Sequence, residues 1–245
     1  MNMIRNFLNT LGFMTRLAPA RVVPDNELFA SMPLMPLVGL ILGLVLAAPW
    51  KLGLLAGHPW VQAWLVVMLG AWLTRGLHHD GLADIFDAVT THAGPERFWE
   101  VVKDSRCGAF GVLALVGLMA GQMVLFHALL QAQAFAALAF VFVFGRFGSV
   151  AFAYMARDIA RPGMGSLLMQ GATFTGTTAA LVLTIVLGLL GMPPLALLLA
   201  FALLGCVLFS LHSLARTVEG ANGDFLGAAT VLAELCAALA AVALP

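Results

Sequence analysis

The sequence has few charged residues, and this scarcity excludes an ordinary soluble protein. Lys, Arg, Asp and Glu together make up 10% of the 245 residues, against roughly 25% in typical soluble domains. Hydrophobic residues make up 62%, and the mean hydropathy is +1.00. Twelve basic and twelve acidic residues give a net charge of zero, so nucleic acid is not an expected partner. The composition is that of an integral membrane protein.

Cysteine is also scarce. Cys107, Cys206 and Cys236 are scattered through the chain and have neither metal-ligand nor redox spacing. We therefore expect them to be small packing residues. The N-terminal segment is amphipathic, is interrupted by Arg5 and Arg16, and lacks a small-residue cleavage site. No cleavable signal peptide is expected.

Long apolar runs dominate what remains. They are continuous rather than alternating, which predicts spanning helices and not barrel strands. The seven candidate spans cover residues 33–50, 59–77, 108–130, 132–155, 174–191, 193–213 and 224–243. The runs 33–50 and 174–191 are near the minimum length for crossing a bilayer, so six spans plus a re-entrant segment is the alternative. The predicted fold is an all-α, polytopic helical bundle that forms one domain over residues 1–245.

The charges divide unevenly between the two ends of these spans. Ten of the twelve basic residues lie in the N-terminal segment and in connections 75–107, 156–173 and 214–224. The positive-inside rule places this side in the cytoplasm of a bacterial inner membrane, with the N-terminus inside. Eleven of the twelve acidic residues lie on the same side or directly beside it. Membrane orientation needs the basic residues but not the acids.

The segment "HHDGLADIFD", residues 78–87, carries three of these acids. If it is helical, Asp80, Asp84 and Asp87 fall within an arc of roughly 60°. Like charges on one helix face repel one another, and oxygen ligands of this kind suit Mg²⁺ or Mn²⁺. A solvated loop with ordinary surface acids is the alternative. His78, which precedes the acids, could orient a carboxylate or contact a substrate.

The segment "KDSRCGAFG", residues 103–111, comes just before the third span. Asp104 could be a further metal ligand, while Lys103 and Arg106 could hold phosphate oxygens. The alternative is a positively charged membrane anchor in which Asp104 or Ser105 caps the following helix.

A third polar segment covers residues 219–235. Asn222 lies in a turn, and Asp224 then enters the last span as either a functional acid or a capping residue. Glu234 lies ten residues deeper, and an acid inside an apolar helix is a functional-site candidate. We expect its partner to be Arg146 of the fourth span, although a purely structural pair is the alternative.

Carboxylates, basic groups and glycines at a membrane face suit the transfer of a phosphoryl-linked group. Metal ions would bridge a diphosphate while a carboxylate takes the proton from an attacking hydroxyl. Spacing alone supports this reaction class and nothing finer. The predicted catalytic segments are residues 75–111 and 219–235, at the cytoplasmic face.

At these residues the sequence resembles the cobalamin synthase (adenosylcobinamide-GDP ribazoletransferase) family. The similar segments are "GLHHDGLADIFDA" (76–88), "VVKDSRCGAFG" (101–111), "NGDFLGAATVLAEL" (222–235), "LGFMTRLAPA" (11–20) and "MPLVGLILGL" (35–44). The resemblance implies transfer of the adenosylcobinamide phosphate group from adenosylcobinamide-GDP to α-ribazole or its 5′-phosphate, with release of GMP. It implies Mg²⁺ and the bacterial inner membrane, and leaves open self-association or association with other enzymes of the pathway.

Carried over residue by residue, the resemblance makes the acids of the first two segments metal ligands and catalytic groups. They are Asp80, Asp84, Asp87 and Asp104. The candidate substrate contacts are His78, Lys103, Ser105, Arg106, Arg146, Asn222, Asp224 and Glu234. The chain departs from the family pattern at Arg75, His79, Cys107 and Ala221-Asn222, but no carboxylate is lost.

Two other functions compete with this one. The aspartates loosely resemble those of the CDP-alcohol phosphotransferases, although the alanine-arginine of that motif is absent. The second alternative is a secondary transporter that uses Asp80, Asp84 and Glu234 as an ion relay. A transporter places such charges near mid-membrane on broken helices, whereas these acids gather at one face, which favours chemistry.

Overall fold

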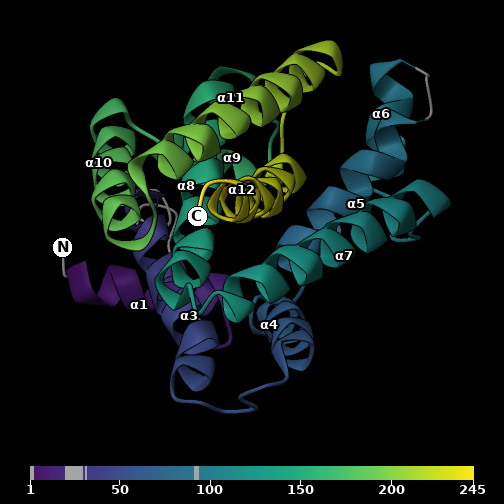
Figure 1. Ribbon diagram of the computed structural model, residues 1–245. Helices are drawn as coiled ribbons and strands as arrows, with labels where there is room; N and C mark the ends of the chain where they lie inside the picture. Colours follow the sequence, from purple (N-terminus) through teal and green to yellow (C-terminus); the bar gives the residue numbers. More distant parts are fainter. Residues whose placement is uncertain (1–2, 20–29, 31, 91–93) are drawn as a thin grey trace.

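The computed structural model describes residues 3–19, 30, 32–90 and 94–245, and helices make up most of this part of the chain (Figure 1). Residues 91–93 of the predicted catalytic segment 75–111 lie outside the described residues. The helices are α1 (Met3–Met14), α3 (Met35–Lys51), α4 (Pro59–Leu73), α5 (Leu77–Val89), α6 (Pro95–Val102), α7 (Ala109–Gln131), α8 (Phe135–Ala156), α9 (Met164–Gly171), α10 (Phe174–Gly191), α11 (Pro194–Thr217) and α12 (Gly223–Ala243). Two 3-10 turns, η1 (Met32–Leu34) and η2 (Arg157–Ile159), precede α3 and follow α8.

Six segments of the described chain are long and apolar enough to cross a membrane. They comprise α3 with η1, α7, α8 with η2, α10, α11 and α12. The remaining predicted span, 59–77, divides in two. Its apolar part is the 15-residue α4, which ends at Leu73, because Arg75 and Gly76 adopt left-handed backbone conformations (φ 58° and 69°) that end a helix. The all-α membrane bundle with about seven spans is thus confirmed, with α4 as a short seventh.

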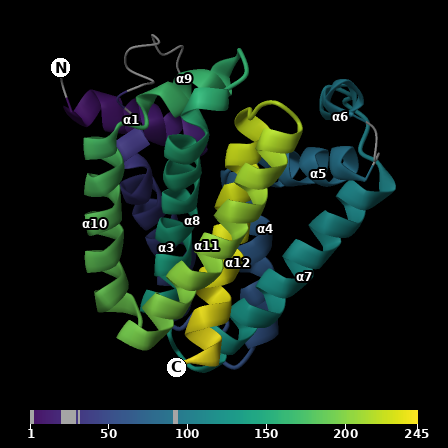
Figure 2. The same ribbon diagram turned by 90° about the horizontal axis from the view of Figure 1, so that it is seen from above.

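The connections alternate between the two ends of the bundle (Figure 2). The links α7–α8 and α10–α11 lie at the same end as the C-terminus. The helices α1, α5, α6 and α9 lie at the opposite end, where the polar segments gather. Because successive spans run in opposite directions, segments far apart in sequence meet at this end.

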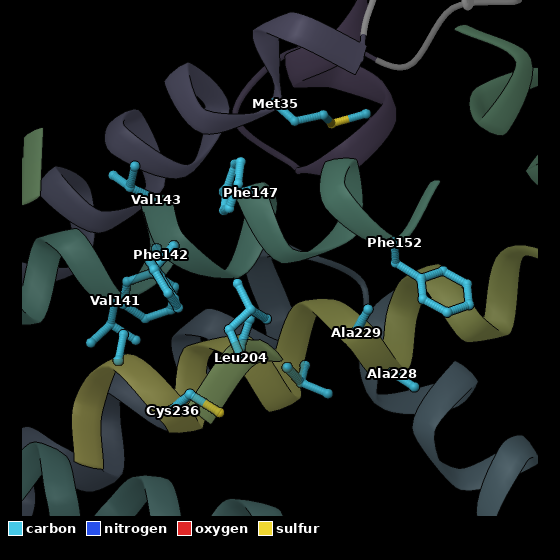
Figure 3. Close-up of a cluster of buried hydrophobic side chains, with 14 of the residues drawn as sticks. Met35, Val141, Phe142, Val143, Phe147, Phe152, Leu204, Ala228, Ala229 and Cys236 are labelled. Atoms are coloured by element: carbon cyan, nitrogen blue, oxygen red, sulfur yellow. The ribbon is translucent and has the colours of Figure 1, made fainter. Parts of the chain in front are cut away.

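Helix α8 forms the centre of the bundle and packs against α3 on one side and α12 on the other. Figure 3 shows Leu204 of α11 and the small residues Ala228, Ala229 and Cys236 of α12 on one side of α8, and Met35 of α3, toward which Phe147 points, on the other. Small residues let the helix backbones approach closely. A Cβ atom added to Gly148, for example, would lie 2.5 Å from the Cβ of Ala233 on α12.

The outer surfaces of the spans are apolar, as lipid contact requires. Large hydrophobic side chains are exposed on α7, α10 and α11, among them Leu113, Val116, Val182, Val186, Leu190, Leu198 and Phe209. Helix α1 exposes Ile4 and Leu8 at the polar end of the bundle, where amphipathic helices lie along a membrane surface.

We predict that Gly43→Ala destabilises the fold, because a Cβ at Gly43 would lie 2.9 Å from the Cα of Ala139 on α8. Overpacking of this kind costs about 1–3 kcal/mol and should lower the apparent Tm in detergent. The matched control is Gly205→Ala on α11, where an added Cβ would meet nothing within 4 Å. Equal Tm values for the two variants would contradict the close α3–α8 contact.

Candidate functional site

The aspartate segment forms a separate helix, α5, that crosses the polar end of the bundle (Figure 2). The left-handed turn at Arg75 and Gly76 redirects the chain between α4 and α5. The Arg75 guanidinium donates 3.1 Å hydrogen bonds to the carbonyls of Gly12 and Phe13, which ties the turn to α1. Residues 78–87 are helical, within Leu77–Val89, so the three acids share one face.

Two glycines allow α5 to lie directly against the start of α12. A Cβ atom at Gly81 would lie 2.8 Å from the Cα of Asp224, and one at Gly227 would lie 3.2 Å from the Cα of His78. Any larger residue would separate the helices. This contact brings Asp224 beside the α5 aspartates, although they are more than 130 residues apart in sequence.

Asp84 lies near three other carboxylates, those of Asp80, Asp87 and Asp224, and we call these four residues the acidic group. Burial, together with the negative charges of Asp80, Asp224 and Asp87, raises the pKa of Asp84 to about 7. Asp84 is half-buried, whereas Asp80 is exposed. A positive ligand in this position would relieve the repulsion among the acids.

Asp87 faces the same group but already has a role in the fold. Its carboxylate accepts hydrogen bonds from the backbone amides of Gly108 (2.6 Å) and Gly111 (2.7 Å) at the start of α7. A carboxylate at a helix N-terminus is favoured by the free N–H groups and the helix dipole. The contact fixes α5 against α7, and metal ligation by Asp87 stays a prediction.

The predicted second segment is mostly exposed. Asp104 and Arg106 pair with each other, with Arg106 Nη2 2.7 Å from Asp104 Oδ2, and this hydrogen bonding lowers the pKa of Asp104 to about 2. Ser105 is exposed beside them, and Lys103 is exposed at the end of α6. Asp104 is therefore held by a cation of its own segment rather than by the α5 acids.

A cavity of about 180 Å³ lies where α1, α5, α8, α9 and α12 meet. Its polar lining comprises His78, Asp80, Ser149 and Asp224, while Phe13, Met14, Leu77, Met164, Leu168 and Leu226 form apolar walls. We call it the ribose-side cavity. The first turn of α12 is positioned there by Asn222, whose Oδ1 accepts from the Asp224 amide and whose Nδ2 donates to Asp224 Oδ2. Asn222 is thus the helix cap, which leaves Asp224 facing the cavity.

The predicted partnership of Arg146 and Glu234 is confirmed. The two form an ion pair inside the bundle, with relative exposures of 2% and 4%, and Gln122 of α7 donates a 3.1 Å hydrogen bond to Glu234. Arg146 Nε and Nη2 have no hydrogen-bond partner in the described part of the chain. A void of about 10 Å³, lined by these residues together with His78 and His79, is the size of one water molecule.

His78 separates this buried polar group from the ribose-side cavity, because it lines both. It is 5% exposed, and its Nε2 has no partner among the described residues. Burial, with the nearby charge of Arg146, lowers the pKa of His78 well below its usual value. The imidazole is therefore neutral at physiological pH.

Sequence reasoning missed several residues of these groups. Gln122 is a lone amide within an apolar span, a signal that could have been used. Ser149 carried no such signal, because it reaches its position through tertiary packing. Among the twelve residues predicted, the structure brings Asp80, Asp84, Asp224 and His78 together. Asp104 and Arg106 instead form an exposed ion pair with each other.

The carboxylates fit a hard divalent cation by donor type but do not form a complete metal site. No three His, Cys, Asp or Glu side chains of the described residues lie close enough together to hold one ion. Asp80, Asp84 and Asp224 supply oxygen donors that repel one another, which is the arrangement that Mg²⁺ shares with substrate phosphates.

Comparison with known proteins gives a consistent result over the whole chain. The family described as cobalamin-5-phosphate synthase matches residues 6–242. A protein of Nitratidesulfovibrio vulgaris strain Miyazaki F, named adenosylcobinamide-GDP ribazoletransferase, is 44% identical over 97% of this chain and 95% of its own length. A protein of the same name from Geotalea daltonii is 34% identical over 90% of this chain and 89% of its own length. No solved structure matches the chain.

We predict that the apparent Tm in metal-free buffer falls as the pH rises from about 4 to 7. The pKa of Asp84 is raised to about 7 from an ordinary value of 3.8, so the folded state binds more protons than the unfolded state in this window, and stability is lost as pH rises. Asp84→Asn should flatten the profile. Asp158→Asn, at an exposed acid on η2, should keep the wild-type slope. Parallel profiles for wild type and Asp84→Asn would contradict the assignment.

We also predict that Glu234→Ala is strongly destabilising, because it leaves Arg146 buried without its anion. Breaking a buried pair costs about 3–5 kcal/mol, whereas replacing both members by apolar residues costs much less. Folded yield and Tm should therefore fall for Glu234→Ala and recover in Arg146→Met/Glu234→Leu. A single variant as stable as the wild type would show that the pair contributes little to the fold.

Proposed function

The chain belongs to the cobalamin-5-phosphate synthase family, and from this premise we propose that it is an adenosylcobinamide-GDP ribazoletransferase. It transfers the adenosylcobinamide phosphate group to α-ribazole or α-ribazole 5′-phosphate and releases GMP. The observation that carries the proposal is the gathering of Asp80, Asp84 and Asp224 from two helices at the polar end of the bundle, where Asp80 and Asp224 line one cavity.

The reaction forms one bond and breaks another at the same phosphorus. A ribose hydroxyl oxygen attacks the phosphorus that carries cobinamide, and the bond from that phosphorus to the bridging oxygen of GMP breaks. The hydroxyl proton passes to a carboxylate of the acidic group, and GMP leaves with the bridging oxygen. Asp84 suits this role, because a carboxylate with a pKa of about 7 is matched to proton transfer near neutral pH.

The ribose-side cavity suits the acceptor. Its apolar walls fit a dimethylbenzimidazole ring, and Asp80 and Asp224 at its edge fit a ribose hydroxyl. His78, neutral and buried in its wall, positions the acceptor without adding charge. The buried Arg146–Glu234 pair lies behind His78, and its role is to hold this part of the cavity wall in place rather than to contact the substrate.

A divalent cation, Mg²⁺ or Mn²⁺, is the proposed cofactor. Asp80 and Asp224 would supply ligands to it together with diphosphate oxygens, while Asp84 would accept the proton. When bound, it would neutralise diphosphate oxygens and stabilise the leaving phosphate. Asp87 keeps α5 fixed against α7, and Lys103 and Arg106 supply the positive charge at the exposed edge. We further propose the bacterial inner membrane as the location, with the site facing the cytoplasm.

We predict that purified protein in nanodiscs releases GMP from adenosylcobinamide-GDP when α-ribazole and Mg²⁺ are present. Asp84→Asn should lower kcat by about 100-fold or more, the size of a lost general base, while the protein stays folded in the membrane. Asp158→Asn should keep wild-type activity. Removal of the cation with a chelator should stop turnover, and Mg²⁺ should raise the Tm of the wild type more than that of Asp84→Asn.

Three results would count against these assignments. Ion flux in liposomes without GMP release would support a transporter instead. Full activity of Asp84→Asn would remove Asp84 from the chemistry. Turnover that persists under chelation would overturn the proposed cation.

A further inference from the structure

A second cavity, of about 370 Å³, opens beside α6 at the same end of the bundle. We call it the α6 cavity. One face of α6 supplies Glu96, Trp99, Glu100 and Lys103, at the spacing that places side chains on one side of a helix. Arg161 and Glu219 complete the lining from the connections after α8 and α11. Its volume is within the range of small-molecule sites.

A planar cation lies on the aromatic floor of this cavity. Trp99 is buried, and its Nε1 donates a 2.7 Å hydrogen bond to the carbonyl of Val218. The Arg161 guanidinium lies over the Trp99 ring at 4.4 Å. The backbone amide of Arg161 is held by the carbonyl of Ala221 at 2.8 Å. Arg guanidinium planes stack on nucleobases, and Arg161 lines the cavity beside Trp99, where a planar ring could contact it.

Carboxylates without internal partners surround this cation. Glu100 is bound to Arg97 at 2.8 Å, but the side chains of Glu96 and Glu219 make no hydrogen bond or ion pair with the described residues. Lys103 lies at the edge and is likewise unpaired there. The cavity thus offers acceptors for a ring with N–H donors, a stacking plane and a cation for a phosphate.

The α6 cavity adjoins the acidic group through the first turn of α12. Phe225 packs against Phe98 and Trp99 of α6, with ring centroids 6.2 Å and 6.3 Å away. The neighbouring residue, Asp224, lines the ribose-side cavity. Phe225 therefore connects Trp99 of the α6 cavity to Asp224 of the ribose-side cavity. We infer that a substrate with a diphosphate in its middle reaches both.

Of the rings present in the two substrates, guanine fits these features. Its N1–H and N2 amino group are adjacent donors that a carboxylate accepts together. Adenine has no such pair of donors, and the dimethylbenzimidazole of α-ribazole has no N–H donor once it is joined to ribose. We propose that the α6 cavity binds the guanine of the GDP-activated donor. Arg161 stacks on the ring, and Glu96 and Glu219 accept its N–H donors. This inference rests on the proposed function.

Direct nucleotide binding tests the inference separately from turnover. Dissociation constants for GMP, IMP and AMP would be measured by equilibrium dialysis with the full chain in nanodiscs with Mg²⁺. IMP lacks the N2 amino group, so the wild type should bind GMP about tenfold or more tightly than IMP, and AMP more weakly still. One of the two variants, Glu219→Gln or Glu96→Gln, should bring the GMP/IMP ratio close to one, because an amide in place of the accepting carboxylate cannot accept both donors.

Arg161→Ala should act differently from the Glu variants. Stacking is available to every base, so this variant should weaken GMP, IMP and AMP by similar factors and keep their ratios. The matched control is Arg157→Ala. Arg157 lies over Tyr154 at 4.5 Å in the same manner but outside the cavity, and its loss should leave all three constants unchanged.

The outcomes separate the two proposals. Selective GMP binding that depends on Glu219 or Glu96, in a protein that releases no GMP from the donor, would sink the proposed reaction but keep the guanine site. Normal turnover with base selectivity unchanged in both Glu variants would overturn the guanine site alone. Loss of α-ribazole binding, rather than GMP binding, in Arg161→Ala would also overturn it.

Discussion

The site depends on the close contact between α5 and the first turns of α12. At Gly81 the two backbones are so near that a Cβ atom would lie 2.8 Å from the Cα of Asp224. This contact places Asp224 near Asp80 and Asp84, and burial, together with the charges of Asp80, Asp224 and Asp87, raises the pKa of Asp84 to about 7. The fold thus accepts an electrostatic cost at the membrane edge. Such a cost is common where a site is arranged to bind a positive group or to move a proton.

The surrounding elements hold this costly contact in place. Asp87 fixes the far end of α5 to the amides that open α7, and Arg75 fixes the near end to α1. Beneath α5, the buried Arg146–Glu234 pair and Gln122 link α7, α8 and α12. Because α8 and α12 also line the ribose-side cavity, the polar groups inside the bundle support the geometry of the site. Charged residues inside a membrane bundle pair with one another in this way.

The two cavities differ in chemistry in a manner that suits the two substrates. The ribose-side cavity is mostly apolar and carries acids at its edge. The α6 cavity is lined by charged residues of both signs around a stacked Arg161. Phe225 in the first turn of α12 contacts Trp99 of the α6 cavity, and its neighbour Asp224 lines the ribose-side cavity.

Much of the fold followed from the sequence alone, because a bilayer restricts the possible structures. Apolar runs of this length must be helices, and the uneven distribution of charge placed the polar segments at one end. The arc of Asp80, Asp84 and Asp87 followed from helical periodicity, and the pairing of Glu234 with Arg146 followed from the cost of an unpaired charge in the membrane. The ends of the predicted spans were less certain. The left-handed turn at Arg75, for instance, ends α4 four residues earlier than the apolar pattern suggests.

What the tertiary structure decided is which acids meet. Periodicity placed Asp87 with its neighbours, but its carboxylate binds the start of α7. Spacing could not show that Asp104 pairs with Arg106, or that Arg161 lies on Trp99, 62 residues away in sequence. The sequence by itself determined the spans and the kind of chemistry, since both depend on local composition. Only packing between distant helices decided the site, because glycine contacts and hydrogen bonds set where each side chain points.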